Sequence, residues 1–237
     1  GTILDEQKVV NFKFDQKEYL GFEGDTLASA LLANGVHLIG RSFKYHRPRG
    51  IFGIGSEEPN ALVRIIKGGT AEPNLRATQI EIYEGLIAES QNRFPSLRFD
   101  FLSINKLFSR FFPAGFYYKT FMWPSSFWML YEKFIRRAAG LGKISKRHLE
   151  QDRYEHKYAH CELLIVGGGA AGLQAAFTAA QTGLRVIIAD EQHKLGGWLL
   201  TDNDFNIGEK PALNWLRDTV EKLKLASNVT CLSRTTV

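Results

Sequence analysis

The sequence contains little cysteine: Cys161 and Cys231 are the two cysteines among 237 residues. Two thiols cannot form a disulfide framework, and they cannot supply the four thiolates of an iron–sulfur cluster. Scarce cysteine is typical of a reducing compartment, so we expect a cytoplasmic protein. The chain opens with no charged-then-apolar leader, which gives no indication of secretion.

Long apolar runs are also missing. The longest, from Leu163 to Leu173, is short and rich in glycine, so we predict no membrane helix. Neither sign of charge dominates, and a formal net charge of +5 does not by itself indicate a nucleic-acid-binding protein. The hydrophobic share of 44% suffices for one large or two small packed domains.

Residues 1–92 have the element order of a β-grasp domain, the plan of ferredoxin-like proteins. Residues 8–23 alternate apolar and polar side chains around a polar tip at 15–17, which predicts a β-hairpin. Asp25 or Thr26 can cap a following helix that stops at Gly35. We expect the apolar face of that helix to consist of Leu27, Ala30, Leu31 and Ala33. A loop, a strand at 60–66 and further strand at 77–90, with Gly85 at its centre, complete the domain.

Residues 93–159 form a connector of unusual composition. About half of the aromatic residues of the chain lie between 94 and 134, which is too apolar for a free linker. Residues 125–140 predict a capped helix that follows Pro124 and stops at Gly140. We expect the aromatic side chains to pack on the flanking domains, and a subunit or cofactor surface is the alternative.

The end of the connector is basic. Residues 136–157 carry an excess of Lys and Arg, which we interpret as a solvated segment. His156, His160 and Cys161 have the spacing of half a zinc site. Because no fourth ligand is evident, we expect no metal there.

The most informative stretch is residues 161–197. The run "LLIV" predicts a parallel strand buried on both faces, and Gly167, Gly169 and Gly172 follow it in G-x-G-x-x-G spacing. The first glycine permits the tight turn, the second lets a pyrophosphate approach, and the third lets the helix pack closely. The helix that follows presents its first N–H groups to a phosphate.

Asp190 closes the next predicted strand, where its carboxylate can accept hydrogen bonds from ribose hydroxyls. An acid there disfavours a 2′-phosphate, so the pattern favours NAD or FAD over NADP. Gly196 and Gly197 follow, a pair typical of flavoprotein folds that bind two dinucleotides. The choice between NAD and FAD stays open, because both present the same adenosine and pyrophosphate.

A helix at 210–226 and a strand at 228–237 end the sequence. A dinucleotide-binding fold needs at least two further strands. We therefore expect residues 160–237 to be the first half of an FAD/NAD(P)-type Rossmann domain, and the chain to be an N-terminal fragment. The predicted fold class is α/β combined with α+β.

The chain resembles the alpha subunits of heterotetrameric sarcosine oxidases. The stretches that carry the resemblance are "GRSFKYHRPRGIFGIGSEEPNALV", "PAGFYYKTFMWP", "FIRRAAGLG", "DRYEHKYAHC" and "LLIVGGGAAGL". The resemblance implies a ferredoxin-like domain without its cluster, followed by an NAD-binding domain. It also implies beta, gamma and delta subunits as partners, FAD on the beta subunit, and FMN near the boundary with that subunit.

The activity that the resemblance implies is oxidative demethylation of sarcosine, with tetrahydrofolate accepting the one-carbon unit through a region absent here. Four residues correspond to the family's NAD fingerprint, Gly167, Gly169, Gly172 and Asp190. Gly196 and Gly197 match the glycine pair that follows it. No residue here corresponds to a catalytic base, because the family places that chemistry on another subunit.

The resemblance also bears on residues 47–63. Related subunits with a working cluster carry C-x-x-x-x-C-x-x-C in this loop, and the three thiolate positions fall here on Gly53, Glu58 and Ala61. None can hold iron as a thiolate does, so we expect this loop to serve as a scaffold. The preceding loop is basic, and we interpret it either as a contact surface for another part of the complex or as ordinary solvated charge. Its cations are Arg41, Lys44, Arg47 and Arg49.

Two other functions are consistent with these residues. The chain can belong to a related amine or imino-acid dehydrogenase in which the dinucleotide is a redox-active FAD. It can also be a structural adaptor whose nucleotide site is incomplete.

Overall fold

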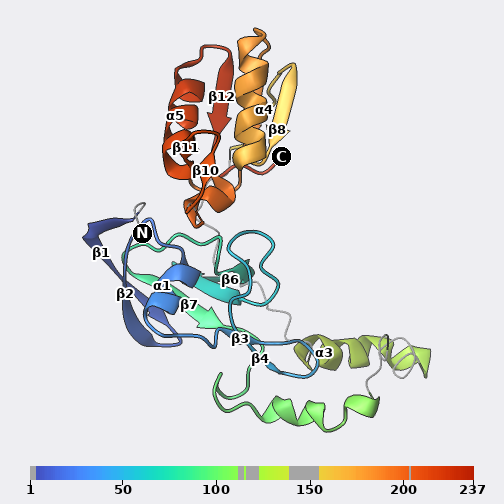
Figure 1. The fold of residues 1–237 in the computed structure, drawn as a ribbon. Helices are drawn as coiled ribbons and strands as arrows, with labels where there is room; N and C mark the ends of the chain where they lie inside the picture. The colour runs from blue at the N-terminus through green and yellow to red at the C-terminus, as the bar shows by residue number, and fades with distance from the viewer. Residues whose placement is uncertain (1–3, 112–114, 116–122, 139–154, 203) are drawn as a thin grey trace. The chain divides into compact units, whose positions relative to one another are not determined.

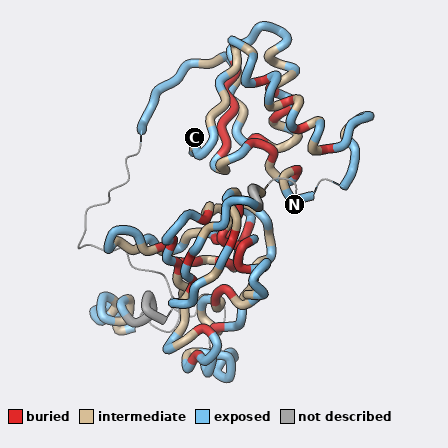
Figure 2. Tube along the Cα trace, turned by 90° about the vertical axis from the view of Figure 1, so that its left-hand side faces the viewer, coloured by how far each residue is buried: buried red, intermediate tan, exposed pale blue. Residues whose placement is uncertain are grey.

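The computed structural model describes residues 4–111, 115, 123–138, 155–202 and 204–237 (Figure 1). The chain divides into two units, residues 1–152 and 153–237, and each is described by itself. In Figure 2 the buried residues of each unit gather on its strands and on the segments that pack against them.

Unit 1 is built on a five-stranded sheet with the order β2-β1-β7-β5-β6. Its strands are β1 (Asp5–Phe14), β2 (Lys17–Glu23), β5 (Leu62–Lys67), β6 (Thr70–Arg76) and β7 (Leu86–Ser90). β1 and β7 pair in parallel, whereas the other neighbours are antiparallel. The predicted hairpin is confirmed: β1 and β2 are joined by Asp15 and Gln16, whose positive φ angles of 47° and 68° make a tight turn.

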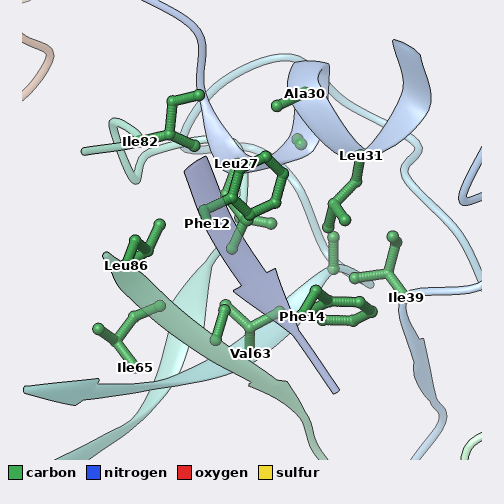
Figure 3. Close-up of a cluster of buried hydrophobic side chains, with 14 of the residues drawn as sticks. Phe12, Phe14, Leu27, Ala30, Leu31, Ile39, Val63, Ile65, Ile82 and Leu86 are labelled. Carbon is green, nitrogen blue, oxygen red and sulfur yellow. The ribbon is translucent and has the colours of Figure 1, made fainter. Parts of the chain in front are cut away.

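The helix α1 (Leu27–Ala33) covers this sheet. Thr26 is its N-cap and forms a capping box with Ser29, so the second of the two predicted caps is the one used. Leu27, Ala30 and Leu31 are buried as predicted; Ala28 is buried too, and Ala33 is exposed, contrary to prediction. Figure 3 shows the core that these residues share with the strands, including Phe12, Phe14, Val63 and Leu86.

One strand of unit 1 differs from the sequence prediction. Residues 77–85 form a loop, and only the second part of the predicted segment is a strand, β7; an additional strand that was not predicted, β6, lies earlier and contains Pro73. β6 is an edge strand, where a missing N–H does not interrupt a ladder. Its register against β5 shifts between Val63 and Ile65, and Asn74 at this irregularity has a φ of 64°. Gly85, with a φ of 79°, turns the chain into β7.

The remaining elements of unit 1 are short. β3 (Gly40–Arg41) pairs with β4 (Pro48–Arg49), and these two strands enclose the basic loop. The connector contains η1 (Phe101–Lys106), η2 (Ser109–Phe111), η3 (Ser125–Phe127) and α3 (Trp128–Ala138). The predicted connector helix is therefore present, although Pro124 provides no side-chain cap and Gly140 lies outside the described residues.

Several aromatic side chains of the connector are exposed. Phe94, Phe99 and Phe101 are about 60% exposed, although their rings contact one another, and Trp123 is 84% exposed. Unit 1 therefore does not provide the packing that we expected for these four rings.

Unit 2 contains a parallel three-stranded sheet with the order β12-β9-β8 and two helices. Its main elements are β8 (Leu163–Val166), α4 (Ala170–Gln181), β9 (Val186–Ala189), α5 (Ala212–Leu225) and β12 (Val229–Leu232). The shorter ones are η4 (Gly197–Leu200), β10 (Asn206–Ile207) and β11 (Lys210–Pro211). The helix and strand predicted at 210–226 and 228–237 correspond to α5 and to the shorter β12.

The first strand of unit 2 is less buried than its sequence predicts. β8 forms one edge of the sheet, and Leu163 and Ile165 pack into the core with α4 and α5. Leu164 and Val166, which alternate with them, are 43% and 70% exposed. The prediction of burial on both faces is therefore wrong for this strand. Within the described part of the chain, no helix is both long enough and apolar enough to span a bilayer.

Candidate functional site

The glycine-rich turn connects β8 to α4. Gly167 has a φ of 101°, which a residue with a side chain rarely adopts, and its N–H donates to Ala189 O at 2.8 Å. Gly169 is the N-cap of α4, and no side chain caps the helix there. The first amides of a helix have no partner within the helix. This turn therefore presents uncapped N–H groups at the positive end of a helix dipole.

Two glycines of the turn serve different purposes. A Cβ added to Gly172 would lie 2.0 Å from the carbonyl oxygen of Gly167, so only glycine allows α4 to pack this closely against the turn. A Cβ added to Gly169 would have no heavy atom within 4 Å. The space beside Gly169 is thus open to an approaching group, as the predicted phosphate contact requires.

Asp190 follows β9 and is 8% exposed. Its Oδ2 accepts a hydrogen bond from Gly168 N, and its Oδ1 accepts one from Gln192 N at 2.7 Å. Sequence reasoning predicted a ligand contact here and missed this structural role. Each carboxylate oxygen has a second acceptor position, so a further hydrogen bond to a ribose hydroxyl is chemically compatible with both contacts.

Gly196 and Gly197 lie against the same turn. Their φ angles are 140° and 53°, and Gly196 N donates to Gly168 O at 2.8 Å. A Cβ added to Gly197 would come within 3.0 Å of Gly169 Cα. The structure therefore brings all six predicted residues together around one turn, with glycines where backbone segments meet most closely.

The cluster-like loop of unit 1 is organised around a carboxylate. Glu58 is 1% exposed; its Oε2 accepts from Phe52 N and Gly53 N, and its Oε1 accepts from Asn60 N and Ala61 N. These four distances lie between 2.5 and 3.1 Å. All three positions that we aligned with thiolates thus take part in one hydrogen-bonded unit. The sequence feature that could have revealed this role is an acidic residue, Glu58, at one of the three thiolate positions of a glycine-rich loop.

A second carboxylate supports the tip of this loop. Glu57 Oε1 accepts from Ile54 N at 2.7 Å and from Gly55 N at 2.9 Å. The pKa of the Glu57 carboxyl is lowered, because backbone N–H groups stabilise its charged form. The N–H of Glu57 itself has the largest effect, followed by those of Ile54 and Gly55.

The basic loop contains one arginine that is not a surface residue. The Arg41 side chain is 8% exposed, and it donates to the carbonyl oxygens of His46, Leu97 and Arg98 at 2.8 to 3.1 Å. Its Nε also lies 3.6 Å from Asp100 Oδ2. Arg41 therefore holds the loop to the connector, and the prediction that it belongs to a contact surface is wrong.

The other cations of the loop differ in exposure. Lys44 and Arg47 lie over the ring of Tyr45, at 4.8 and 5.0 Å from its centroid. Arg47 is exposed, whereas Arg49 is half-buried. Of the predicted contact surface, Arg47 is therefore the most accessible cation.

Arg41 belongs to a buried polar cluster that the sequence did not reveal. His46 Nδ1 lies 2.7 Å from Asp100 Oδ2, and both side chains are fully buried. Asp100 Oδ1 accepts from Phe94 N and Leu102 N. This cluster joins segments more than 50 residues apart, so no local pattern could indicate it. Among the described residues, no group of three or more His, Cys, Asp or Glu side chains is placed to hold a metal ion.

Comparison with known proteins gives two family matches. Residues 7–93 match the family described as "2Fe-2S iron-sulfur cluster binding domain". Residues 162–204 match the family described as "FAD dependent oxidoreductase". The crystal structure of L-proline dehydrogenase from P. horikoshii has a similar fold, with a TM-score of 0.57 at 20% identity over 98% of this chain and 34% of that one.

Sarcosine oxidase alpha subunits are similar to this chain along its whole length. The sarcosine oxidase alpha subunit of Rhizobium meliloti (strain 1021) is 56% identical over 235 residues, which is 99% of this chain and 24% of that protein. The corresponding subunit of Corynebacterium sp. (strain U-96) is 30% identical over 240 residues, covering 100% of this chain and 20% of that subunit. This chain spans a quarter or less of the length of these relatives, and over that span it is similar to sarcosine oxidase alpha subunits.

Proposed function

We propose that this chain is the NAD-binding part of the alpha subunit of a sarcosine oxidase-type complex, an oxidoreductase acting on CH–NH donors. The complex would oxidatively demethylate sarcosine, with tetrahydrofolate as the one-carbon acceptor. The observation that carries the proposal is the convergence of all six predicted residues on the turn after β8. The similarity to sarcosine oxidase alpha subunits supports the choice of reaction.

The role of this chain is to bind the dinucleotide. The uncapped amides at the start of α4 would receive the pyrophosphate, and the open space at Gly169 would admit it. Asp190 would accept hydrogen bonds from the adenosine ribose. A bound dinucleotide supplies a redox-active ring, and we assign no catalytic residue to this chain. In this view residues 160–237 are the first half of a Rossmann-type domain, preceded by a connector at 93–159.

We also propose that the ferredoxin-like domain, residues 1–92, holds no cluster. Cysteine is absent from positions 53, 58 and 61, and the Glu58 carboxylate already accepts the loop amides. In iron–sulfur proteins such amides commonly donate to the sulfurs. Assays for iron and acid-labile sulfide in the purified protein test this, and stoichiometric amounts of both would contradict it.

The partners in this proposal are the beta, gamma and delta subunits of a heterotetramer. FAD would be held by the complex, and FMN would lie near the boundary with the beta subunit. We place the complex in the cytoplasm, because Cys161 and Cys231 are free thiols, as is usual in a reducing compartment.

The bound nucleotide can be identified directly. The purified protein is denatured, and the supernatant is analysed by chromatography and visible absorption. Release of NAD from a colourless chain is the expected result. A flavin spectrum from this chain would support the second candidate below, and release of no nucleotide would leave only a structural adaptor.

The second candidate is a subunit of a related FAD-dependent amine or imino-acid dehydrogenase. The observation that favours it is the match of residues 162–204 to the family of FAD dependent oxidoreductases. The geometry of the turn is compatible with both nucleotides, because the parts of NAD and FAD that would meet it are the same.

A further inference from the structure

A pocket of about 180 Å³ lies in unit 1, beside the paired strands β3 and β4. Segments distant in the sequence line it: residues 41–43, Arg49, 59–60, Leu62 and 91–92. All of them belong to unit 1, so the pocket shares no residue with the turn proposed to bind a dinucleotide. A volume of this size has room for a small organic molecule or for one residue of a peptide.

One of the lining residues, Asn92, carries a buried acceptor without a partner among the described residues. Asn92 Nδ2 donates to Ser42 O at 2.5 Å and to Arg41 O at 3.2 Å. These two bonds fix the orientation of the amide, because the opposite orientation would bring its oxygen against two carbonyl oxygens. Asn92 Oδ1 is therefore a true acceptor, and it is buried without a partner among the described residues. Such an atom is normally satisfied by an N–H or O–H donor, from ordered water or from a bound group.

The pocket also contains a cation without a counter-charge. Arg49 is half-buried in the short strand β4, and no carboxylate of the described residues pairs with its guanidinium. The other arginine of the pocket, Arg41, is balanced by Asp100 at 3.6 Å. Asn60, whose side-chain amide has no hydrogen-bond partner in the described structure, lies beside them in the lining. A guanidinium fork and an amide together are suited to a carboxylate.

We propose that this pocket binds a carboxylate that carries an N–H group on the adjacent carbon. Arg49 and Asn60 would bind the carboxylate, and Asn92 Oδ1 would accept the N–H. Two kinds of molecule have this chemistry: a free amino acid, and the C-terminal residue of a polypeptide. The proposal does not depend on the nucleotide site, because none of these residues lies in unit 2.

Isothermal titration calorimetry on the whole 237-residue chain tests the proposal. The probes are glycine, triglycine and triglycine amide, which lacks the carboxylate. We expect saturable binding of glycine or triglycine and none of the amide. Arg49→Gln should weaken binding about tenfold or more, because the charge-assisted hydrogen bonds are lost. The matched control is Arg47→Gln, which removes an exposed cation outside the pocket and should leave the affinity unchanged.

Two further comparisons identify the ligand class and test the role of Arg49. Tighter binding of glycine would identify a free amino acid as the ligand class, and tighter binding of triglycine would identify a chain terminus. Arg49→Lys keeps the charge without the fork, so it should bind with intermediate affinity and serves if Arg49→Gln does not fold. Absence of saturable binding to wild type, or equal weakening by Arg47→Gln and Arg49→Gln, would overturn the proposal.

Discussion

Gly168 donates its backbone N–H to Oδ2 of Asp190, which lies 22 residues further along the chain. The other carboxylate oxygen accepts from Gln192 N at 2.7 Å. The carboxylate thus joins the end of β9 to the glycine-rich turn through contacts within the chain itself. An acid predicted for nucleotide binding is therefore also a part of the local structure, and the two roles must be separated experimentally.

Substitutions at Asp190 should separate these roles. Asp190→Arg removes both acceptors and leaves two backbone N–H groups unpaired, so we expect a loss of about 1–3 kcal/mol of stability for each buried group, together with weaker NAD binding. Asp190→Asn keeps one acceptor oxygen and places an NH₂ group against the other donor, so it should lose about half as much stability. Urea unfolding and NAD titration by calorimetry measure the two effects. The control is Asp202→Asn, which changes an exposed acid, and an unchanged NAD affinity in folded Asp190→Arg would refute the ribose contact.

The glycines of the turn give a matched pair of variants. In Gly172→Ala the new Cβ would lie 2.0 Å from Gly167 O, so α4 must shift and unit 2 should lose about 1–3 kcal/mol of stability. In Gly169→Ala the new Cβ meets no atom within 4 Å, and stability should be unchanged or slightly raised.

Nucleotide binding should respond differently in this pair. The methyl group of Gly169→Ala projects into the space that we assign to the pyrophosphate, so binding should weaken without loss of stability. Scanning calorimetry with and without NAD measures both quantities. Undiminished NAD binding by Gly169→Ala would place the pyrophosphate elsewhere.

The sequence predicted those features of the fold that depend on neighbouring residues. The polar tip at 15–17 marked the hairpin turn, Thr26 was one of two proposed caps, and the glycine spacing marked the turn before α4. Each of these signals acts within a few residues. Local chemistry alone is therefore enough to recognise them.

Features that depend on tertiary position were missed. No strand was predicted at 70–76, where β6 contains Pro73 and tolerates it because it lies at the edge of the sheet. The apolar run of β8 predicted burial on both faces, but Val166 is exposed on the face opposite the helices. Arg41 looked like a surface cation, whereas Asp100, distant in sequence, makes its burial possible. In each case the burial or pairing of the residue depends on segments that are distant in the sequence.

Glu57 should make the loop of unit 1 sensitive to acid. Its pKa is lowered in the folded protein, so its stabilising effect is fully present above the unfolded pKa and is lost as the pH falls through the folded pKa. The stability difference between wild type and Glu57→Gln should be constant near neutral pH and shrink below about pH 4. Because the carboxylate is exposed, we expect less than about 1 kcal/mol. Urea unfolding at several pH values measures it, and a difference that grows on acidification would contradict the assignment.

Glu58 provides the sharpest test of how the cluster-like loop is held together. Its buried carboxylate accepts four backbone hydrogen bonds, whereas the amide of Glu58→Gln has one oxygen and an NH₂ group that would face donors. At least two backbone N–H groups would lose their acceptor, at about 1–3 kcal/mol for each buried group. We therefore expect faster amide hydrogen exchange in residues 52–61, measured by mass spectrometry.

The neighbouring carboxylate supplies the control, because Glu57→Gln removes an acceptor from the same loop at an exposed position. Its effect on exchange should be confined to Ile54 and Gly55 and should be smaller. If Glu58→Gln left exchange unchanged at Phe52, Gly53, Asn60 and Ala61, the four hydrogen bonds would not stabilise the loop. Protection would then have to come from side-chain packing around Ala61, which is fully buried. Faster exchange in Glu58→Gln would instead show that the Glu58 carboxylate stabilises this loop, which has no cysteine ligands for a metal.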